Sequence, residues 1–79
     1  MIREIKNYIE NNDFKIVILN NRVNVVNYKD IIKISTQLIS IDSGTDIINI
    51  KGDNLVLCKL LDDEILIIGR ISNVEVKAY

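Results

Sequence analysis

The chain lacks histidine, proline and tryptophan, and it contains a single cysteine, Cys58. One cysteine cannot form an intramolecular disulfide, and one thiol without histidine does not provide the ligands of a structural zinc site. The absence of histidine also removes the commonest general base and the usual activator of a serine or cysteine nucleophile. The composition therefore predicts a protein with no disulfide, no metal, no cofactor and no catalytic residues.

An excess of charge of one sign is also missing, because the formal net charge is −1 and the basic residues form no run. Nucleic-acid binding needs a clustered positive surface, so nucleic acid is not an expected partner. No apolar stretch approaches the ~20 residues of a membrane span, and residues 1–12 lack the continuous apolar segment of a signal peptide. We therefore expect a cytoplasmic protein without a direct membrane span, in which the thiol stays reduced.

The hydrophobic periodicity changes once along the chain, after residue 12. Ile2, Ile5 and Ile9 recur at helical spacing, which predicts a short amphipathic N-terminal helix over residues 1–12. From residue 13 to 79, short β-branched segments alternate with turn signals, which predicts a single β domain. The turn signals are Asn20-Asn21, Asp42-Ser43-Gly44, Gly52-Asp53-Asn54 and Asp62-Asp63.

This spacing predicts a mainly β fold, an antiparallel β meander of about seven or eight short strands that forms a small sandwich or a partly closed barrel. Gly44, Gly52 and Gly69 are expected at positive φ or at β-bulges. The expected core consists of Ile48, Ile50, Leu55, Leu57, Ile65 and Ile67.

Three segments are apolar on both faces of their predicted strands: Ile47-Ile48, Leu55-Val56-Leu57-Cys58 and Ile65-Leu66-Ile67-Ile68. A strand of an antiparallel sheet with one solvated face normally alternates between apolar and polar residues. Something must therefore cover the second face of these strands, either the N-terminal helix or another subunit. A domain this short also has a small core and often gains stability from a partner, so we expect a homo-oligomer.

The residues that could carry chemistry have simpler structural interpretations. Cys58 lies in the middle of a strand and is expected to act as a small buried hydrophobe. Lys59 is expected to point to the opposite face of the strand, where it would not activate the thiol. The cluster Asp62-Asp63-Glu64 lacks the spaced ligands and the glycine of a calcium loop, which favours a solvated hairpin turn. We therefore expect no catalytic, cofactor-binding or metal-binding residues.

Between residues 21 and 76, five short segments occur in a characteristic order, ending in a segment of the form Ile-x-Gly-x-Ile. The segments are Asn21-Arg22-Val23, Asn27-Tyr28-Lys29-Asp30-Ile31, Ile39-Ser40-Ile41, Ile48-Asn49-Ile50-Lys51-Gly52-Asp53-Asn54-Leu55 and Glu64-Ile65-Leu66-Ile67-Ile68-Gly69-Arg70-Ile71. With these segments the chain resembles the YabP/YqfC family of sporulation proteins, and the YqfC branch most closely.

The resemblance implies a role in endospore formation, in the mother cell of a sporulating bacterium, with a peripheral position at the forespore membrane. It implies no enzymatic activity, and a membrane-bound sporulation protein as a partner. The segment before Asp13 is shorter than the usual leader of the family. The leading hypothesis is a structural or partner-binding element of forespore envelope or coat assembly. The alternative is a small β-barrel binding module for an extended peptide or glycan ligand, since an open sheet edge can bind an extended chain.

Overall fold

The computed structural model describes residues 13–79, which form one antiparallel sheet in the strand order β1-β2-β6-β5-β4-β3. The predicted mainly β fold is therefore confirmed, whereas the helix predicted over residues 1–12 lies outside the described residues. The strands are β1 (Lys15–Leu19), β2 (Arg22–Val26), β3 (Asp30–Ile34), β4 (Leu38–Asp42), β5 (Asp46–Leu61) and β6 (Glu64–Ala78).

The predicted strand number is wrong, because two glycine segments bend the chain and do not reverse it. β5 and β6 have 16 and 15 residues; β5 runs through Gly52-Asp53-Asn54, which the sequence pattern predicted to be a turn, and β6 runs through Gly69. Between them the pairing register shifts at Lys51/Gly52 and at Asp53/Val56, with φ values of 54° at Asn54 and 144° at Gly69. Such β-bulges bend a strand and increase its twist. The described chain therefore forms six strands, two of them long and bent.

The sheet is not a simple meander, because β2 and β3 follow each other in the chain but lie in different parts of the sheet. The long β5–β6 hairpin occupies the middle positions and separates them. β1 and β3 end the strand order and do not pair with each other, so the six strands form one open sheet where the sequence predicted a small sandwich or a partly closed barrel. The turns predicted at Asn20-Asn21, Asp42-Ser43-Gly44 and Asp62-Asp63 all join antiparallel neighbours, as expected.

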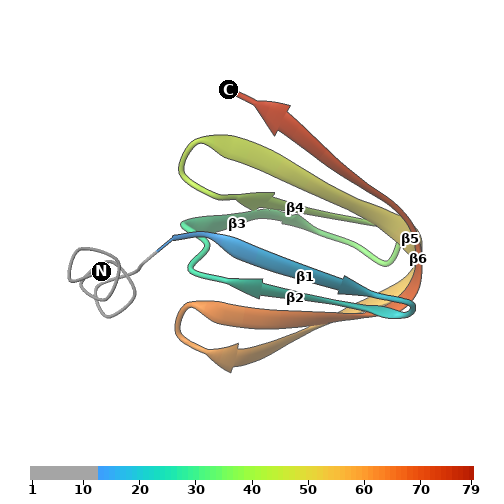
Figure 1. Ribbon diagram of the computed structural model, residues 1–79. Coiled ribbons are helices and arrows are strands. Elements are labelled where there is room, and N and C mark those ends of the chain that lie inside the picture. Colours follow the sequence, from blue (N-terminus) through green and yellow to red (C-terminus); the bar gives the residue numbers. More distant parts are fainter. Residues whose placement is uncertain (1–12) are drawn as a thin grey trace.

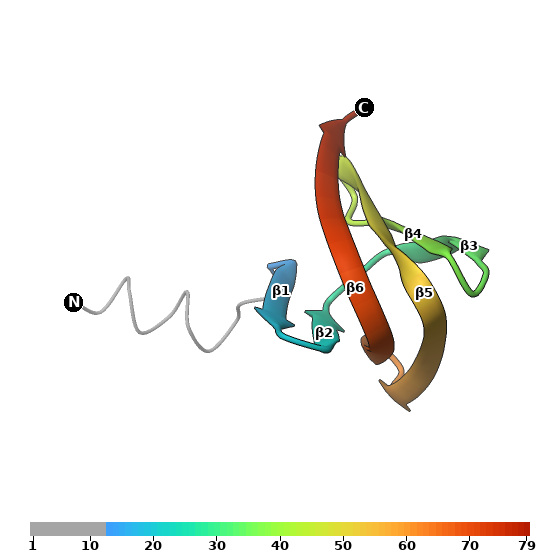
Figure 2. The same cartoon turned by 90° about the vertical axis from the view of Figure 1, so that its right-hand side faces the viewer.

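The bend in β5 and β6 divides the sheet into two halves that fold toward each other (Figure 1). The β1–β2 half contains β1, β2, residues 64–68 of β6 and residues 56–61 of β5. The β3–β4 half contains β3, β4, residues 46–51 of β5 and residues 71–78 of β6. Figure 2 shows β6 as a continuous curved strand with β1 and β2 on one side and β5, β4 and β3 on the other.

The core lies between the two halves and consists of branched aliphatic side chains from both. Each side chain moved from water into such a core contributes about 1.5–3 kcal/mol to folding. Of the six predicted core residues, all except Leu57 are buried, and Leu57 is half-buried against the others. The buried residues are Val23, Val25, Ile39, Ile41, Ile48, Ile50, Leu55, Ile65 and Ile67.

The three glycines follow the prediction of positive φ or a bulge, for two different reasons. Gly44 has φ of 105° in the turn between β4 and β5, and Gly69 has φ of 144° at the bend of β6. Gly52 does not have positive φ but lies at a register shift, where the β6 backbone approaches closely. Gly52 is thus needed because its site has no room for a side chain, and not because its backbone is left-handed.

Candidate functional site

Cys58, the only thiol, lies on the side of the β1–β2 half that faces away from the core. It is free and half-buried, not fully buried as predicted, and its cross-strand partner is Leu66. Lys59 is paired with the buried Ile65, so it projects to the other face of the strand, as predicted. Among residues 13–79, no group of three or more histidine, cysteine, aspartate or glutamate side chains could hold a metal ion.

The acidic cluster forms the hairpin turn between β5 and β6, as predicted. Asp62 and Asp63 are exposed, and their backbone carbonyls accept hydrogen bonds from the Tyr28 hydroxyl (3.3 Å) and the Asn27 backbone N–H (2.7 Å). The Glu64 carboxylate accepts a hydrogen bond of 3.1 Å from the Asn24 side-chain amide. The cluster therefore helps to hold β2 and the hairpin together.

The β1–β2 half carries an apolar outer surface, which we call the outer face. Its members can be assigned because directly paired residues of neighbouring strands point to the same side of a sheet. Val56 pairs with Ile68, Cys58 with Leu66 and Leu61 with Glu64, all on the side opposite the buried Ile65 and Ile67. The apolar residues of the outer face are Val17, Leu19, Val26, Val56, Cys58, Leu61, Leu66 and Ile68.

This surface is exposed to an extent that is unusual for large aliphatic side chains. Val56, Leu19 and Leu61 are 56%, 54% and 60% exposed, and Val17 and Ile68 are each 42% exposed. Contiguous apolar surface of this kind typically marks a contact with another protein or a membrane. The expectation that strands around residues 55–58 and 65–68 are apolar on both faces is therefore confirmed, and β1 shares the same property.

The sequence interpretation missed the contribution of β1 to the outer face. Ile16 packs against the core, whereas Val17 and Leu19 lie on the outer face, so the segment Ile16-Val17-Ile18-Leu19 is apolar on both sides. The signal that identified residues 55–58 and 65–68, a run of consecutive apolar residues within a predicted strand, is also present in β1.

A polar row crosses the corresponding surface of the β3–β4 half, which also carries the half-buried Ile47 and Leu38. Ser40 donates a hydrogen bond of 2.6 Å to the Asn49 side-chain oxygen, and the Asn49 amide contacts the Glu75 carboxylate at 3.5 Å. Lys33 is paired with Ser40 and extends this polar row across the half. This polar row distinguishes the surface from the outer face of the β1–β2 half, although Ile32, Ile34 and Val76 of the β3–β4 half are also 53%, 58% and 60% exposed.

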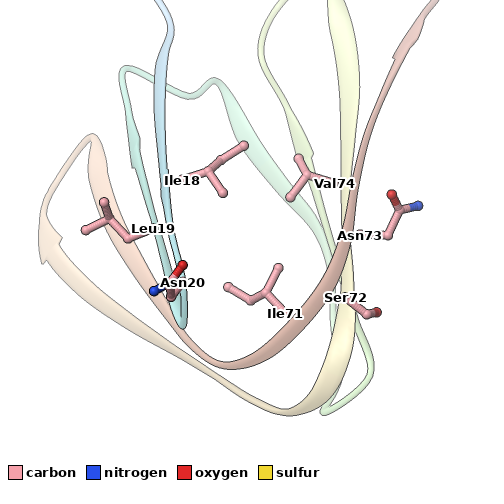
Figure 3. A pocket seen from close by; sticks show the side chains of 7 residues that line it. All are labelled: Ile18, Leu19, Asn20, Ile71, Ser72, Asn73 and Val74. Carbon is pink, nitrogen blue, oxygen red and sulfur yellow. The ribbon is translucent and has the colours of Figure 1, made fainter.

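A shallow groove of about 400 Å³ lies between the end of β1 and the part of β6 that follows the bend. Figure 3 shows Ile18, Ile71 and Val74 around this space. β2 pairs with β6 only as far as Ile68, so among the described strands none pairs with this edge of β6. The groove is lined by Ile18, Leu19, Asn20, Ile71, Ser72, Asn73 and Val74.

The C-terminal residue is tied to the turn between β4 and β5. The Tyr79 hydroxyl donates a hydrogen bond to Oδ1 of Asp42, which also accepts one of 2.7 Å from the Gly44 N–H. The hydrogen bond to Asp42 raises the pKa of Tyr79 to about 12. The hydrogen bonds from Tyr79 and Gly44, together with the charge of Lys29, lower the pKa of Asp42.

We expect one tyrosine of the folded protein to ionise near pH 12, and replacement of Tyr79 by phenylalanine to remove this component. Because the pKa of Tyr79 is raised above its ordinary value of 10.0, its contribution to stability is present below pH 10 and is lost as the pH rises toward 12. Spectrophotometric titration of tyrosinate absorbance measures this ionisation in the unmodified protein and in the Tyr79→Phe variant. Tyr28→Phe is the control, and retention of the late component in Tyr79→Phe would contradict the assignment.

Comparisons of the chain with protein-family models, with curated proteins and with solved structures find no match. Within residues 13–79 there is no helix with the length and apolar character needed to cross a membrane.

Proposed function

We propose that the protein is a non-catalytic sporulation protein that acts as a structural or partner-binding element in the assembly of the forespore envelope or coat. The observation that carries the proposal is the apolar outer face, which is solvent-exposed in the isolated chain although aliphatic surface of this kind favours burial. The segments that resemble the YabP/YqfC family supply the cellular context. The outer face supplies the means of binding, and no catalytic residue is assigned.

In this proposal the protein acts in the mother-cell cytoplasm, associates with itself and is held at the forespore membrane by a membrane-bound sporulation protein. Val56 and Ile68, which are paired across β5 and β6, lie in the exposed apolar surface that such contacts would bury. The polar row of the β3–β4 half would remain in water, so an assembly would present this side to the cytoplasm.

The proposal is tested in the bacterium that encodes the chain, with a fluorescent fusion and a gene deletion. We expect the fusion to collect around the forespore during sporulation, and the deletion strain to yield fewer heat-resistant spores. A strain carrying Leu66→Lys on the outer face is expected to reproduce the deletion, whereas Lys33→Glu on the polar row is the control. Normal spores in the deletion strain, together with a diffuse fusion, would exclude this function.

The groove favours a second function, a small β module that binds an extended peptide or a glycan strand. The edge of β6 after Ile71 faces this groove, and a peptide could add to it as a further strand while an apolar side chain fills the space beside Ile18 and Val74. Amide chemical-shift changes centred on residues 71–74 after addition of an extended peptide would support it. Changes confined to the outer face would instead favour the assembly role.

A further inference from the structure

We propose that the outer face is a homodimer interface, in which two copies of the chain pack face to face about a two-fold axis with Arg22 of each copy opposite Glu64 of the other. This inference rests on the proposed function, because it names a second copy as the partner of the apolar surface. It is argued from the cross-strand register, the exposure of the face and the position of its charges.

The outer face is an array of three cross-strand rows over four strands, with one register shift on β5 between Lys59 and Leu61. The middle row contains the apolar pair Leu66 and Cys58, and the rows on either side each contain one charged residue of the two central strands. From the β1 side to the β5 side, the rows are Leu19-Arg22-Ile68-Val56, Val17-Asn24-Leu66-Cys58 and Lys15-Val26-Glu64-Leu61.

The two central charges lie at diagonally opposite positions about the middle of the array. Arg22 is in the first row on β2, Glu64 is in the third row on β6, and the midpoint between them falls between Asn24 and Leu66. The Glu64 carboxylate accepts the Asn24 hydrogen bond through Oε2, which fixes the orientation of this acidic group. A two-fold axis that lies in the plane of the contact and bisects the line from Arg22 to Glu64 therefore places each of these two charges opposite its counter-charge. The third charge of the array, Lys15, is exposed on the edge strand β1, outside the central pair.

The same two-fold rotation also brings apolar residues of the two copies into contact with each other. With strands about 4.8 Å apart and alternate residues about 6.7 Å apart along a strand, an axis that superposes Arg22 on Glu64 of the second copy places Leu66 over Leu66. It also brings Cys58 close to Val56 and Ile68 of the other copy. The strands of the two copies then cross at an angle of about 40°, which is close to the ~30° at which aligned sheets pack.

The size of the face sets the strength of the contact. Four strands and five residues per strand cover about 19 by 16 Å, or about 300 Å² on each copy, which is well below the roughly 800 Å² per partner of a standard protein interface. Burial of the exposed Val17, Leu19, Val56, Leu61 and Ile68 supplies the attraction, and the charge pairs set the orientation. We therefore expect a dimer that dissociates on dilution.

The experiment measures the solution mass of the full-length chain by sedimentation equilibrium from micromolar to millimolar concentration. We expect a monomer–dimer equilibrium in the unmodified protein. Arg22→Glu is expected to raise the dimer dissociation constant about tenfold or more, because it places two like charges opposite each other twice in each dimer. The combination Arg22→Glu with Glu64→Arg is expected to restore most of the loss. Lys33→Glu, on the polar row, makes the same change in net charge and is expected to leave dimerisation unchanged.

Amide chemical shifts of the unmodified protein, recorded during dilution, provide a readout that does not depend on the folding of any variant. We expect concentration-dependent shifts at Cys58, Leu66 and Ile68, and none along Ser40, Asn49 and Glu75. A protein that stays monomeric at millimolar concentration overturns the proposal and indicates that residues 1–12 or a different protein cover the outer face. A dimer that the combined charge reversal fails to restore, or whose shifts lie elsewhere, also overturns it.

This outcome is separable from that of the proposed function. A strict monomer whose gene deletion still impairs spores refutes the homodimer and keeps the sporulation role, with another protein as the partner. A dimer with the predicted charge dependence whose gene deletion leaves spores normal keeps the interface and refutes the sporulation role.

Discussion

Replacing Gly52 with alanine is expected to lower the free energy of unfolding by at least about 2 kcal/mol, because the site has no room for a methyl group. A Cβ atom built at Gly52 would lie 2.0 Å from the backbone oxygen of Arg70 and 3.1 Å from the Cα of Ile71. Both atoms belong to the β6 backbone. They can move only if the pairing between β5 and β6 is disturbed at the bend that brings the two halves of the sheet together.

A thermal or urea unfolding curve measures this effect, and for a domain of this size about 2 kcal/mol corresponds to a fall of about 8–16 °C in the melting temperature. Gly44→Ala is the matched control, because a Cβ atom there meets nothing within 4 Å although φ is 105°. Its cost is therefore backbone strain alone, about 1–3 kcal/mol. If Gly52→Ala melts at the temperature of the unmodified protein, the close approach of β6 to Gly52 is wrong.

The contrast between these glycines explains which parts of the fold could be predicted from the sequence. Asp42-Ser43-Gly44 and Gly52-Asp53-Asn54 carry the same local turn chemistry, yet the first reverses the chain and the second lies within a strand. The difference is not local, because β5 and β6 pair with each other on both sides of the bulge. Turn propensity sets where a chain can deviate from a regular strand, whereas long-range pairing decides whether it reverses or bends.

The order of the strands in the sheet also depends on long-range pairing that local sequence signals do not show. Neighbouring strands that are joined by short turns, such as β1 and β2, pair as the turn signals predict. The segment Asn27-Tyr28-Lys29 also joins two strands closely in sequence, and Asn27 has the positive φ of 62° that is common at turns. Yet β2 and β3 belong to different halves, because both edges of the β5–β6 hairpin need a partner strand. The need for a partner strand at each edge can be recognised only when it is known that β5 and β6 form one long hairpin.

The sequence predicted that some strands are apolar on both faces, but only partly which residues form the exposed apolar surface. A run such as Ile65-Leu66-Ile67-Ile68 shows that both faces of a strand are apolar, but it does not show which face becomes the core. The cross-strand register decides this, because a shift of one residue would move every side chain of the strand to the other face. In the structure Ile65 and Ile67 face the opposite half of the sheet, and Leu66 and Ile68 face outward.

From this assignment we predict that two neighbouring isoleucines of β6 differ strongly in their contribution to the free energy of unfolding. Ile67 is fully buried, so Ile67→Ala removes core contacts and leaves a cavity, and we expect a loss of about 2–5 kcal/mol in the free energy of unfolding. Ile68 is 42% exposed on the outer face, so Ile68→Ala removes less buried surface, and we expect a loss below about 1 kcal/mol.

Both variants are compared by urea unfolding at low protein concentration, where the proposed dimer is dissociated and only the stability of the single chain is measured. The two substitutions have the same chemistry, occur in the same strand and remove the same atoms. Any difference between them therefore reports which face of β6 is the core. A larger loss for Ile68→Ala would place the core on the other face of the β1–β2 half. The exposed apolar surface would then consist of Ile65 and Ile67, and the pairing of Arg22 with Glu64 across a two-fold axis would lose its basis.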